Sequence, residues 1–259
     1  MAPTLVEAAA FEYADGTVLA AHAHPRAQLV YAVSGTMTVF TEAGVWVVPP
    51  QRAVWVPAES RHEIRMSGTV AMRTLYLGRG TPHDSADRCF VVSVRPLLRE
   101  LILECVRLGG RHERRRSALE GLLLDELREA SVAPLYLPEP HDDRLVRITR
   151  ALRADPGDAR SLDEWARVVG AGTRTLARLF LAETGLSFRA WRQQARLLGS
   201  LELLAQGVPV ARVSSELGYS STSAFIHMFR RALGVTPSRY FTATTTSALA
   251  PAKLAASRH

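Results

Sequence analysis

The sequence predicts an α+β protein with two domains, an antiparallel β-barrel followed by an all-α domain with two helix-turn-helix motifs. Its 259 residues are enough for two hydrophobic cores. Short apolar runs separated by Gly, Pro and Ser occupy residues 17–77, whereas apolar residues recur at helical spacing after residue 95. Two later segments, 161–185 and 209–234, share one layout. Together these observations place the β domain before the helical domain.

Residues 1–82 are expected to form the β domain. Their apolar runs lie at 28–33, 37–41, 45–48, 53–56 and 72–77, with turn-forming residues between them. Several short strands at such regular spacing are typical of an antiparallel sandwich or barrel.

A helical hairpin is expected within residues 83–135. Apolar residues recur at helical spacing over 95–108 and 114–130, and Gly109 and Gly110 lie between these two runs. The apolar face of such a hairpin needs a partner, either the β domain or a second copy of the chain in a homodimer. The sequence leaves both uses open.

Residues 136–241 are expected to form the helical domain. Three prolines predict a linker over residues 131–141, and the Thr- and Ala-rich composition of residues 242–259 predicts a flexible tail. Residues 141–241 contain 15 arginines and 9 acidic residues, whereas residues 1–140 contain 15 arginines and 16 acidic residues. The basic excess of the helical part favours phosphate binding, with a solvated basic surface as the alternative.

The two repeated segments each predict two short helices around a tight turn. Both contain an apolar residue, a small residue, a glycine for the turn, two more apolar residues and a closing glycine. In the first segment these are Leu162, Ala166, Gly170, Leu176, Phe180 and Gly185. In the second they are Val210, Ser214, Gly218, Phe225, Phe229 and Gly234. An amphipathic helix over residues 188–204 is expected to fix the distance between the two units.

The run "LGYSSTSAFIHMFRRALGVTPSRY" at residues 217–240 resembles the AraC/XylS family of transcriptional regulators. The resemblance extends over residues 142–241. It implies that two recognition helices enter successive major-groove segments on one face of double-stranded DNA, about one turn apart. It also implies RNA polymerase as a further partner, and a place of action in the cytoplasm at the nucleoid.

The same resemblance assigns DNA-contacting positions to both units. The residues expected to read base edges are Arg174, Ala177, Arg178, Thr222, Ser223 and His227. Those expected near the phosphates are Ser221, Arg230 and Arg231. Arg178 is the leading base-reading residue because a guanidinium group can donate two parallel hydrogen bonds to guanine. For any one arginine, the alternative is an ordinary surface ion pair.

A second pattern, G-x5-H-x-H-x3-Q-x6-G, extends from Gly16 to Gly35 and resembles the first motif of the cupins. A weaker second motif, "VPAESRH", ends at His62, although Glu59 replaces its expected glycine. The resemblance covers residues 6–77 and implies a cupin-type sensor domain with a small-molecule or metal effector.

In metal-binding cupins, such side chains point into the barrel from two strands. By resemblance, His22, His24, Gln28 and His62 would form the site. Three imidazoles and one amide oxygen are suitable ligands for a divalent first-row ion such as zinc, nickel, manganese or iron. Gln28 stands where the family has a glutamate, so the site lacks an anionic ligand and is expected to hold a cation more weakly. The alternative is a metal-free effector pocket or a set of barrel hydrogen bonds.

Several other classes of protein are disfavoured. No apolar run approaches the roughly 18 residues of a membrane-spanning helix, and residues 1–10 lack the features of a secretory signal. Cys89 and Cys105 are too few for a disulfide or metal framework. We therefore expect a DNA-binding regulator with a cupin sensor, not an enzyme. The alternative is a cupin metalloenzyme, dioxygenase-like or isomerase-like, fused to a DNA-binding module.

Overall fold

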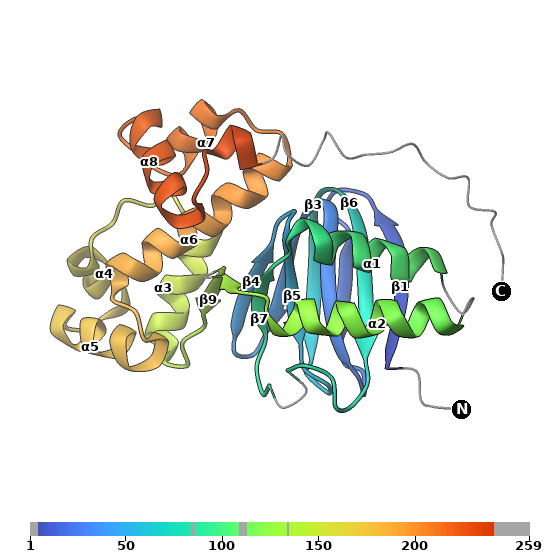
Figure 1. Ribbon diagram of the computed structural model, residues 1–259. Helices are drawn as coiled ribbons and strands as arrows, with labels where there is room; N and C mark the ends of the chain where they lie inside the picture. The colour runs from blue at the N-terminus through green and yellow to red at the C-terminus, as the bar shows by residue number, and fades with distance from the viewer. Residues whose placement is uncertain (1–4, 84–85, 109–112, 134, 241–259) are drawn as a thin grey trace.

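A computed structural model of the protein describes residues 5–83, 86–108, 113–133 and 135–240. The predicted flexible tail and the glycine pair of the predicted hairpin turn lie outside these residues. Within them, an antiparallel sheet with two covering helices is followed by a helical domain (Figure 1). The predicted α+β organisation is confirmed.

The sheet contains nine strands, of which seven come from the N-terminal part. These are β1 (Val6–Tyr13), β2 (Val18–His22), β3 (Ala27–Thr41), β4 (Gly44–Val48), β5 (Arg52–Val56), β6 (His62–Leu77) and β7 (Phe90–Ser93). The predicted runs lie in β3 to β6, whereas β1 and β7 were not among them. The runs at 28–33 and 37–41 form one strand, which corrects the prediction of two.

The long strands β3 and β6 bend instead of ending in turns. Their pairing shifts register between Ala32 and Thr36, around Gly35, whose φ is +72°. A Cβ atom on Gly35 would lie 2.7 Å from the carbonyl oxygen of Thr69, so the close approach of the two strands requires glycine. The bend lets the two ends of a long strand pair with different neighbours, as β3 does with β5 and with β4.

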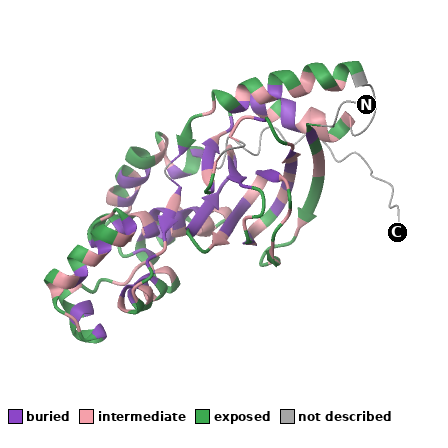
Figure 2. Ribbon diagram, turned by 90° about the horizontal axis from the view of Figure 1, so that it is seen from below, coloured by how far each residue is buried: buried purple, intermediate pink, exposed green. Residues whose placement is uncertain are grey.

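The residues of β3 alternate between two cores. Val30 and Val39 belong to a cluster that continues into the helical domain, whereas Leu29 and Tyr31 belong to a cluster on the other face. That second cluster is covered by α1 (Pro96–Leu108) and α2 (Glu113–Arg128). Strands β3, β4 and β5 are therefore buried on both faces and are largely purple in Figure 2, whereas β1 and β2 are largely exposed.

The helical hairpin thus packs on the sheet, which was one of its two predicted uses. Its buried residues are Leu98, Leu101, Ile102, Leu123 and Leu127. Two further leucines, Leu97 and Leu122, remain 48% and 45% exposed.

The predicted linker is wrong. Residues in this segment form β8 (Val132–Ala133), which pairs with β7, and β9 (Tyr136–Pro138), which pairs with β4. The boundary placed before residue 136 therefore separates β9 from the sheet to which it belongs. Leu135 and Leu137 are 0% and 2% exposed, so apolar burial outweighs the prolines, which are tolerated at the edge of a sheet.

The helical domain contains α3 (Asp143–Ala154), α4 (Leu162–Val169), α5 (Thr173–Thr184), α6 (Phe188–Ala205), α7 (Val210–Glu216) and α8 (Thr222–Leu233). The repeated helix pairs and the long spacer helix are present as predicted. No helix in the described part of the chain is long and apolar enough to cross a membrane.

Helix α6 contacts the sheet near both of its ends. The indole Nε1 of Trp191 donates a hydrogen bond of 2.9 Å to the carbonyl of Pro138 in β9. Trp191 is completely buried, so this hydrogen bond is shielded from solvent. Farther along α6, the hydroxyl of Thr38 in β3 donates to the carboxylate of Glu202. These two contacts fix α6, and with it both helix pairs, on the sheet.

Candidate DNA interface and histidine site

The first helix pair, α4 and α5, begins with a capping box. The Ser161 hydroxyl oxygen accepts from the amide of Glu164 at 3.2 Å, and the Glu164 carboxylate accepts from the amide of Ser161 at 2.7 Å. Gly170 ends α4 with a φ of +68°, a conformation that favours glycine. These features start α4 at a defined residue and turn the chain into α5.

The second pair, α7 and α8, turns in the same way. The amide of Tyr219 donates to the carbonyl of Ser214 at 3.0 Å, and the amide of Ala171 donates to the carbonyl of Ala166 at 2.9 Å in the first pair. Gly218 has a φ of +69°, and a Cβ atom there would lie 2.7 Å from the carbonyl oxygen of Gly157. The repeated sequence layout is therefore a repeated backbone structure.

The three predicted base-reading residues of α5 share one exposed face. Arg174, Ala177 and Arg178 are all exposed, whereas Leu176 and Phe180 on the other face are completely buried. Within the described part of the chain, no ion pair holds Arg174 or Arg178. Both guanidinium groups are therefore available to a ligand.

The predicted residues of α8 also lie along one side of their helix. Ser223 and His227 are exposed, and Thr222 is half-buried in the first turn. Arg230 and Arg231 are exposed in the last turn. Eight residues of helix place Arg231 about 12 Å beyond Ser223 along the axis. The last turn of α8 would thus contact phosphates at a place separate from the bases that its first turn would read.

Ser221 has a structural role that the sequence prediction did not include. It is the N-cap of α8, and its hydroxyl oxygen accepts from the amide of Ala224 at 3.2 Å. The residue is exposed and its hydroxyl group can still donate a hydrogen bond, so a phosphate contact remains a prediction beside the capping role. Figure 1 shows α5 and α8 on either side of α6, away from the sheet.

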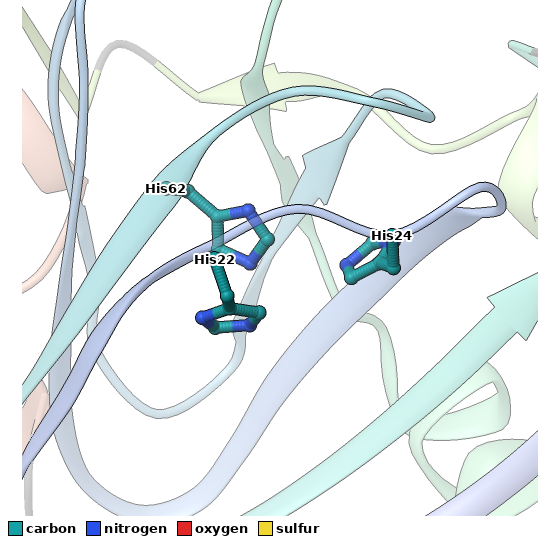
Figure 3. Close-up of side chains that lie close together, drawn as sticks. All are labelled: His22, His24 and His62. Carbon is teal, nitrogen blue, oxygen red and sulfur yellow. The ribbon is translucent and has the colours of Figure 1, made fainter.

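The predicted histidines meet at one edge of the sheet (Figure 3). His22 ends β2 and is the register partner of His62, which begins β6, and His24 follows two residues after His22. The ring centroids of His22 and His62 lie 4.4 Å apart, and those of His24 and His62 lie 5.2 Å apart. One ligand nitrogen from each ring lies within 4.8 Å of the others.

Backbone carbonyls set the protonation of these rings. Each Nδ1 lies 2.6–2.8 Å from a carbonyl oxygen, that of Ala20, Arg26 or Ser60 for His22, His24 and His62 respectively. A neutral imidazole that donates through Nδ1 carries its lone pair on Nε2. A ring in this tautomer offers the Nε2 lone pair to a metal ion.

His62 is the most constrained of the three. It is 1% exposed, and its Nε2 has no hydrogen-bond partner among the described residues. Burial lowers the pKa of His62, and the nearby His22 and His24 lower it further, against the bond to Ser60, which raises it. A neutral imidazole with a buried, unpartnered lone pair is a good metal ligand.

Gln28 completes the cluster, and Thr74 sets its orientation. The Thr74 hydroxyl donates to the carbonyl of Leu29 at 3.2 Å and accepts from Nε2 of Gln28 at 2.8 Å. The amide oxygen of Gln28 therefore faces Nε2 of His24, at 2.9 Å. This contact is a hydrogen bond when Nε2 of His24 carries a proton. When the proton is on Nδ1, the same two atoms can instead be held by one cation.

The geometry fits a first-row divalent ion. Bonds from a first-row divalent ion to nitrogen or oxygen are about 2.1 Å, so neighbouring ligands lie about 3.0 Å apart on an octahedral ion and about 3.4 Å apart on a tetrahedral one. The facing Gln28 and His24 atoms are 2.9 Å apart, and one nitrogen from each of the three histidines lies within 4.8 Å of the others. Residues predicted from four separate positions are brought together, with Thr74 as an orienting residue that the sequence did not reveal.

Comparison with known proteins agrees with this division of the chain. A family model described as a helix-turn-helix domain matches residues 165–243, and one described as a cupin domain matches residues 9–78. The HTH-type transcriptional regulator NimR of Escherichia coli is 36% identical over 87% of this chain and 83% of its own. The chain belongs to the AraC/XylS family of transcriptional regulators.

Further relatives of this AraC/XylS regulator match smaller or more distant parts of known proteins. RipA of Corynebacterium glutamicum is 39% identical over 41% of this chain and 31% of its own. Among solved structures, ToxT from Vibrio cholerae has a TM-score of 0.40 at 11% identity, covering 92% of this chain and 98% of ToxT. The DNA-binding domain of AdpA, solved with a target DNA, has a TM-score of 0.39 at 25% identity, covering 41% and 97%.

A cavity of about 880 Å³ also lies between the two domains of this AraC/XylS regulator. It is lined by Thr38, Phe40 and Met66 from the sheet and by Leu198 and Glu202 from α6. Burial raises the pKa of Glu202, although the hydrogen bond from Thr38 and the charge of Arg65 oppose this shift. No sequence motif marked this cavity, because its walls come from distant segments.

Proposed function

We propose that this regulator reads its operator through two unequal recognition helices. α5 would present Arg174, Ala177 and Arg178 to base edges, and α8 would present its first-turn residues and His227. The observation that carries this proposal is the pair of exposed faces on two helix pairs with matching backbone turns. Arg178 is suited to bidentate bonding with guanine, so specificity would depend more on the first unit. Ser221, Arg230 and Arg231 would contact phosphates.

We further propose that the cupin domain senses a divalent metal, or a small molecule held by one. The ligands would be Nε2 of His22, His24 and His62 and the amide oxygen of Gln28. Such an ion would supply Lewis acidity, and an effector oxygen or nitrogen would bind by replacing the Gln28 oxygen or by raising the coordination number above four. Because all four ligands are neutral, the bound ion would keep its full positive charge, and binding would be weaker than with a glutamate.

The contacts of α6 support a route from the sensor to DNA. β9 pairs with β4 and accepts the Trp191 hydrogen bond, and β3 supplies Thr38 to Glu202. The sensor would bias DNA binding by favouring one arrangement of these contacts over another, which requires different effector affinities for the two arrangements. The cavity between the domains would give α6 room to change its position on the sheet.

In this proposal the cupin domain has no catalytic role, and the chain has two further partners, a second copy of itself and RNA polymerase. The exposed Leu97 and Leu122 on the hairpin would form a homodimer contact, and RNA polymerase would be reached at the promoter. The regulator would act at the nucleoid.

The histidine cluster favours the metalloenzyme as a second candidate. That candidate requires turnover by purified protein, which would be lost in His22→Ala or His62→Ala.

Genome-wide footprinting with and without a chelator tests the proposal. We expect discrete protected sites whose occupancy changes when metal is removed, and the same change in His62→Ala. His141→Ala is the matched control, because His141 is an exposed histidine outside the cluster. Absence of discrete sites would contradict operator reading. Sites unaffected by chelation and by His62→Ala would contradict the metal sensor but leave DNA reading intact.

A further inference from the structure

Between the two helix pairs, three arginines of α6 line a cleft of about 540 Å³. We call this the arginine cleft, and it is lined by Arg189, Arg192, Gln193, Arg196, Tyr219 and Met228. Tyr219 lies in the turn between α7 and α8, and Met228 lies on α8 itself. The cleft therefore borders the second recognition unit.

The arginine cleft opens on the side of α6 turned away from the sheet. Ala195, Leu198 and Glu202, on another face of α6, line the cavity against the sheet. On a helix with 3.6 residues per turn, Arg189 and Arg196 share a face that points well away from Leu198 and Glu202. Figure 1 shows α5 and α8 beside this part of α6, with the sheet on the other side.

The arginines are held in place without carboxylate partners. Arg192 donates to the carbonyl of Arg160 at 2.9 Å, and its guanidinium lies 5.2 Å from the ring centroid of Phe188. Arg196 donates to the carbonyl of Pro156 at 2.9 Å. Arg189 is exposed, with no hydrogen bond or ion pair among the described residues. Neutral carbonyls orient two of these side chains but leave their charges uncompensated.

The electrostatics of the cleft favour an anion. Burial lowers the pKa of Arg192, and the positive charges of Arg196 and Arg189 lower it further, although Asp158 opposes this. The Asp158 carboxylate is itself bound by Arg160, so it does not neutralise the cleft. Arginine remains charged in proteins, and like charges held together repel until a counter-charge arrives. An anionic group in the cleft would relieve this repulsion.

We propose that the arginine cleft binds the DNA phosphates that lie between the two major-groove segments. This inference rests on the proposed DNA reading. α6 has 18 residues and is therefore about 27 Å long. Two major-groove segments one turn apart are separated by about 34 Å, with a minor groove and its flanking phosphates between them. A duplex on α5 and α8 thus brings this middle backbone, with one charge per ~1.7 Å, opposite α6.

The salt dependence of DNA affinity distinguishes a phosphate contact of the arginine cleft from a contact with a base. The full-length protein would be titrated with the duplex that it selects from a random-sequence pool and with a scrambled duplex. Arg189→Gln and Arg192→Gln should each lower the slope of log K against log salt by about 0.9 on both duplexes, without changing base preference. Arg128→Gln is the matched control on α2, where an exposed arginine pairs with Asp125. Arg189 is the more informative site, since no described contact depends on it.

Neutral phosphates locate the contact on the DNA. Methylphosphonates placed midway between the two protected major-groove segments should weaken binding of the wild type and have little further effect on Arg189→Gln. Unchanged salt slopes in both variants, or full additivity with the neutral phosphates, would overturn the proposal. If the wild type selects no sequence, operator reading fails, but the slopes on the scrambled duplex still test the cleft.

Discussion

The two helix-turn-helix units have matching cores but different outer surfaces. Leu176 and Phe180 in the first unit correspond to Phe225 and Phe229 in the second, and all four are completely buried. On the outside, α5 carries two arginines without an ion-pair partner among the residues that the structure describes, whereas α8 carries short polar residues and His227. Their helix starts differ too, because α8 has a side-chain cap from Ser221 and α5 has none at Gly172.

This difference shows which properties the repeat constrains. The fold of each unit depends on the buried positions and on the turn glycines, so these positions match. Base reading depends on exposed positions that touch no neighbour, so these positions can differ without affecting the fold. The long guanidinium groups of α5 can make bidentate base contacts, whereas Thr222 and Ser223 reach less far and discriminate less.

The largest expected effect tests whether the two cores are equivalent. Phe180→Ala and Phe229→Ala each remove a completely buried ring, so each should lower the free energy of unfolding by about 3–5 kcal/mol. Denaturant unfolding of the full chain, followed by circular dichroism, would measure both. Leu181→Ala is a control, since Leu181 is 61% exposed and should cost little. A much smaller loss from one of the two Phe variants would show that the units are unequal inside as well.

The next effect tests whether the outer faces are unequal. Arg178→Ala should weaken binding to the selected duplex by about 1–3 kcal/mol and relax preference at one base pair, because a bidentate contact is lost. His227→Ala should weaken it less. Fluorescence anisotropy against single-base variants of the duplex would measure both. Equal losses would contradict the dominance of the first unit, and no loss in Arg178→Ala would remove its base-reading role.

Local patterns made much of this molecule predictable from sequence. Gly170 and Gly218 marked the turns because the left-handed backbone there favours glycine. The histidine pattern marked the cupin site through its resemblance to a family motif, and His22 and His62 are register partners across β2 and β6. The turns and the histidine pattern were predictable because they depend on residues that are close together in the sequence.

Long-range pairing was not predictable in the same way. The prolines near β9 suggested a linker, and nothing local indicated that Leu137 would pair with Val45. Thr38 and Glu202 are 164 positions apart, and neither belongs to a recognisable motif. Such contacts depend on how the domains meet, which the spacing of residues in one segment does not encode.

The smallest expected effect concerns how the two ends of α6 are attached to the sheet. The attachment near the first unit, from Trp191 to Pro138, is neutral, whereas the one nearer the second unit involves an ionisable carboxyl group. Burial raises the pKa of Glu202 above its ordinary value of 4.5, so folding favours the protonated form. The contribution of this group to the free energy of unfolding is therefore greatest below pH 4.5 and falls as pH rises through the raised pKa.

Glu202→Gln should remove that dependence, because an amide accepts the Thr38 hydrogen bond without ionising. Relative to the wild type, the variant should gain stability as pH rises from 4.5 toward neutrality, because only the wild type must ionise a buried carboxyl group. Thermal unfolding across this range would measure the difference, and Trp191→Phe is the control, since losing a neutral hydrogen bond should shift stability equally at every pH. A Glu202→Gln curve parallel to the wild type would mean that both ends of α6 are held by contacts that do not respond to pH.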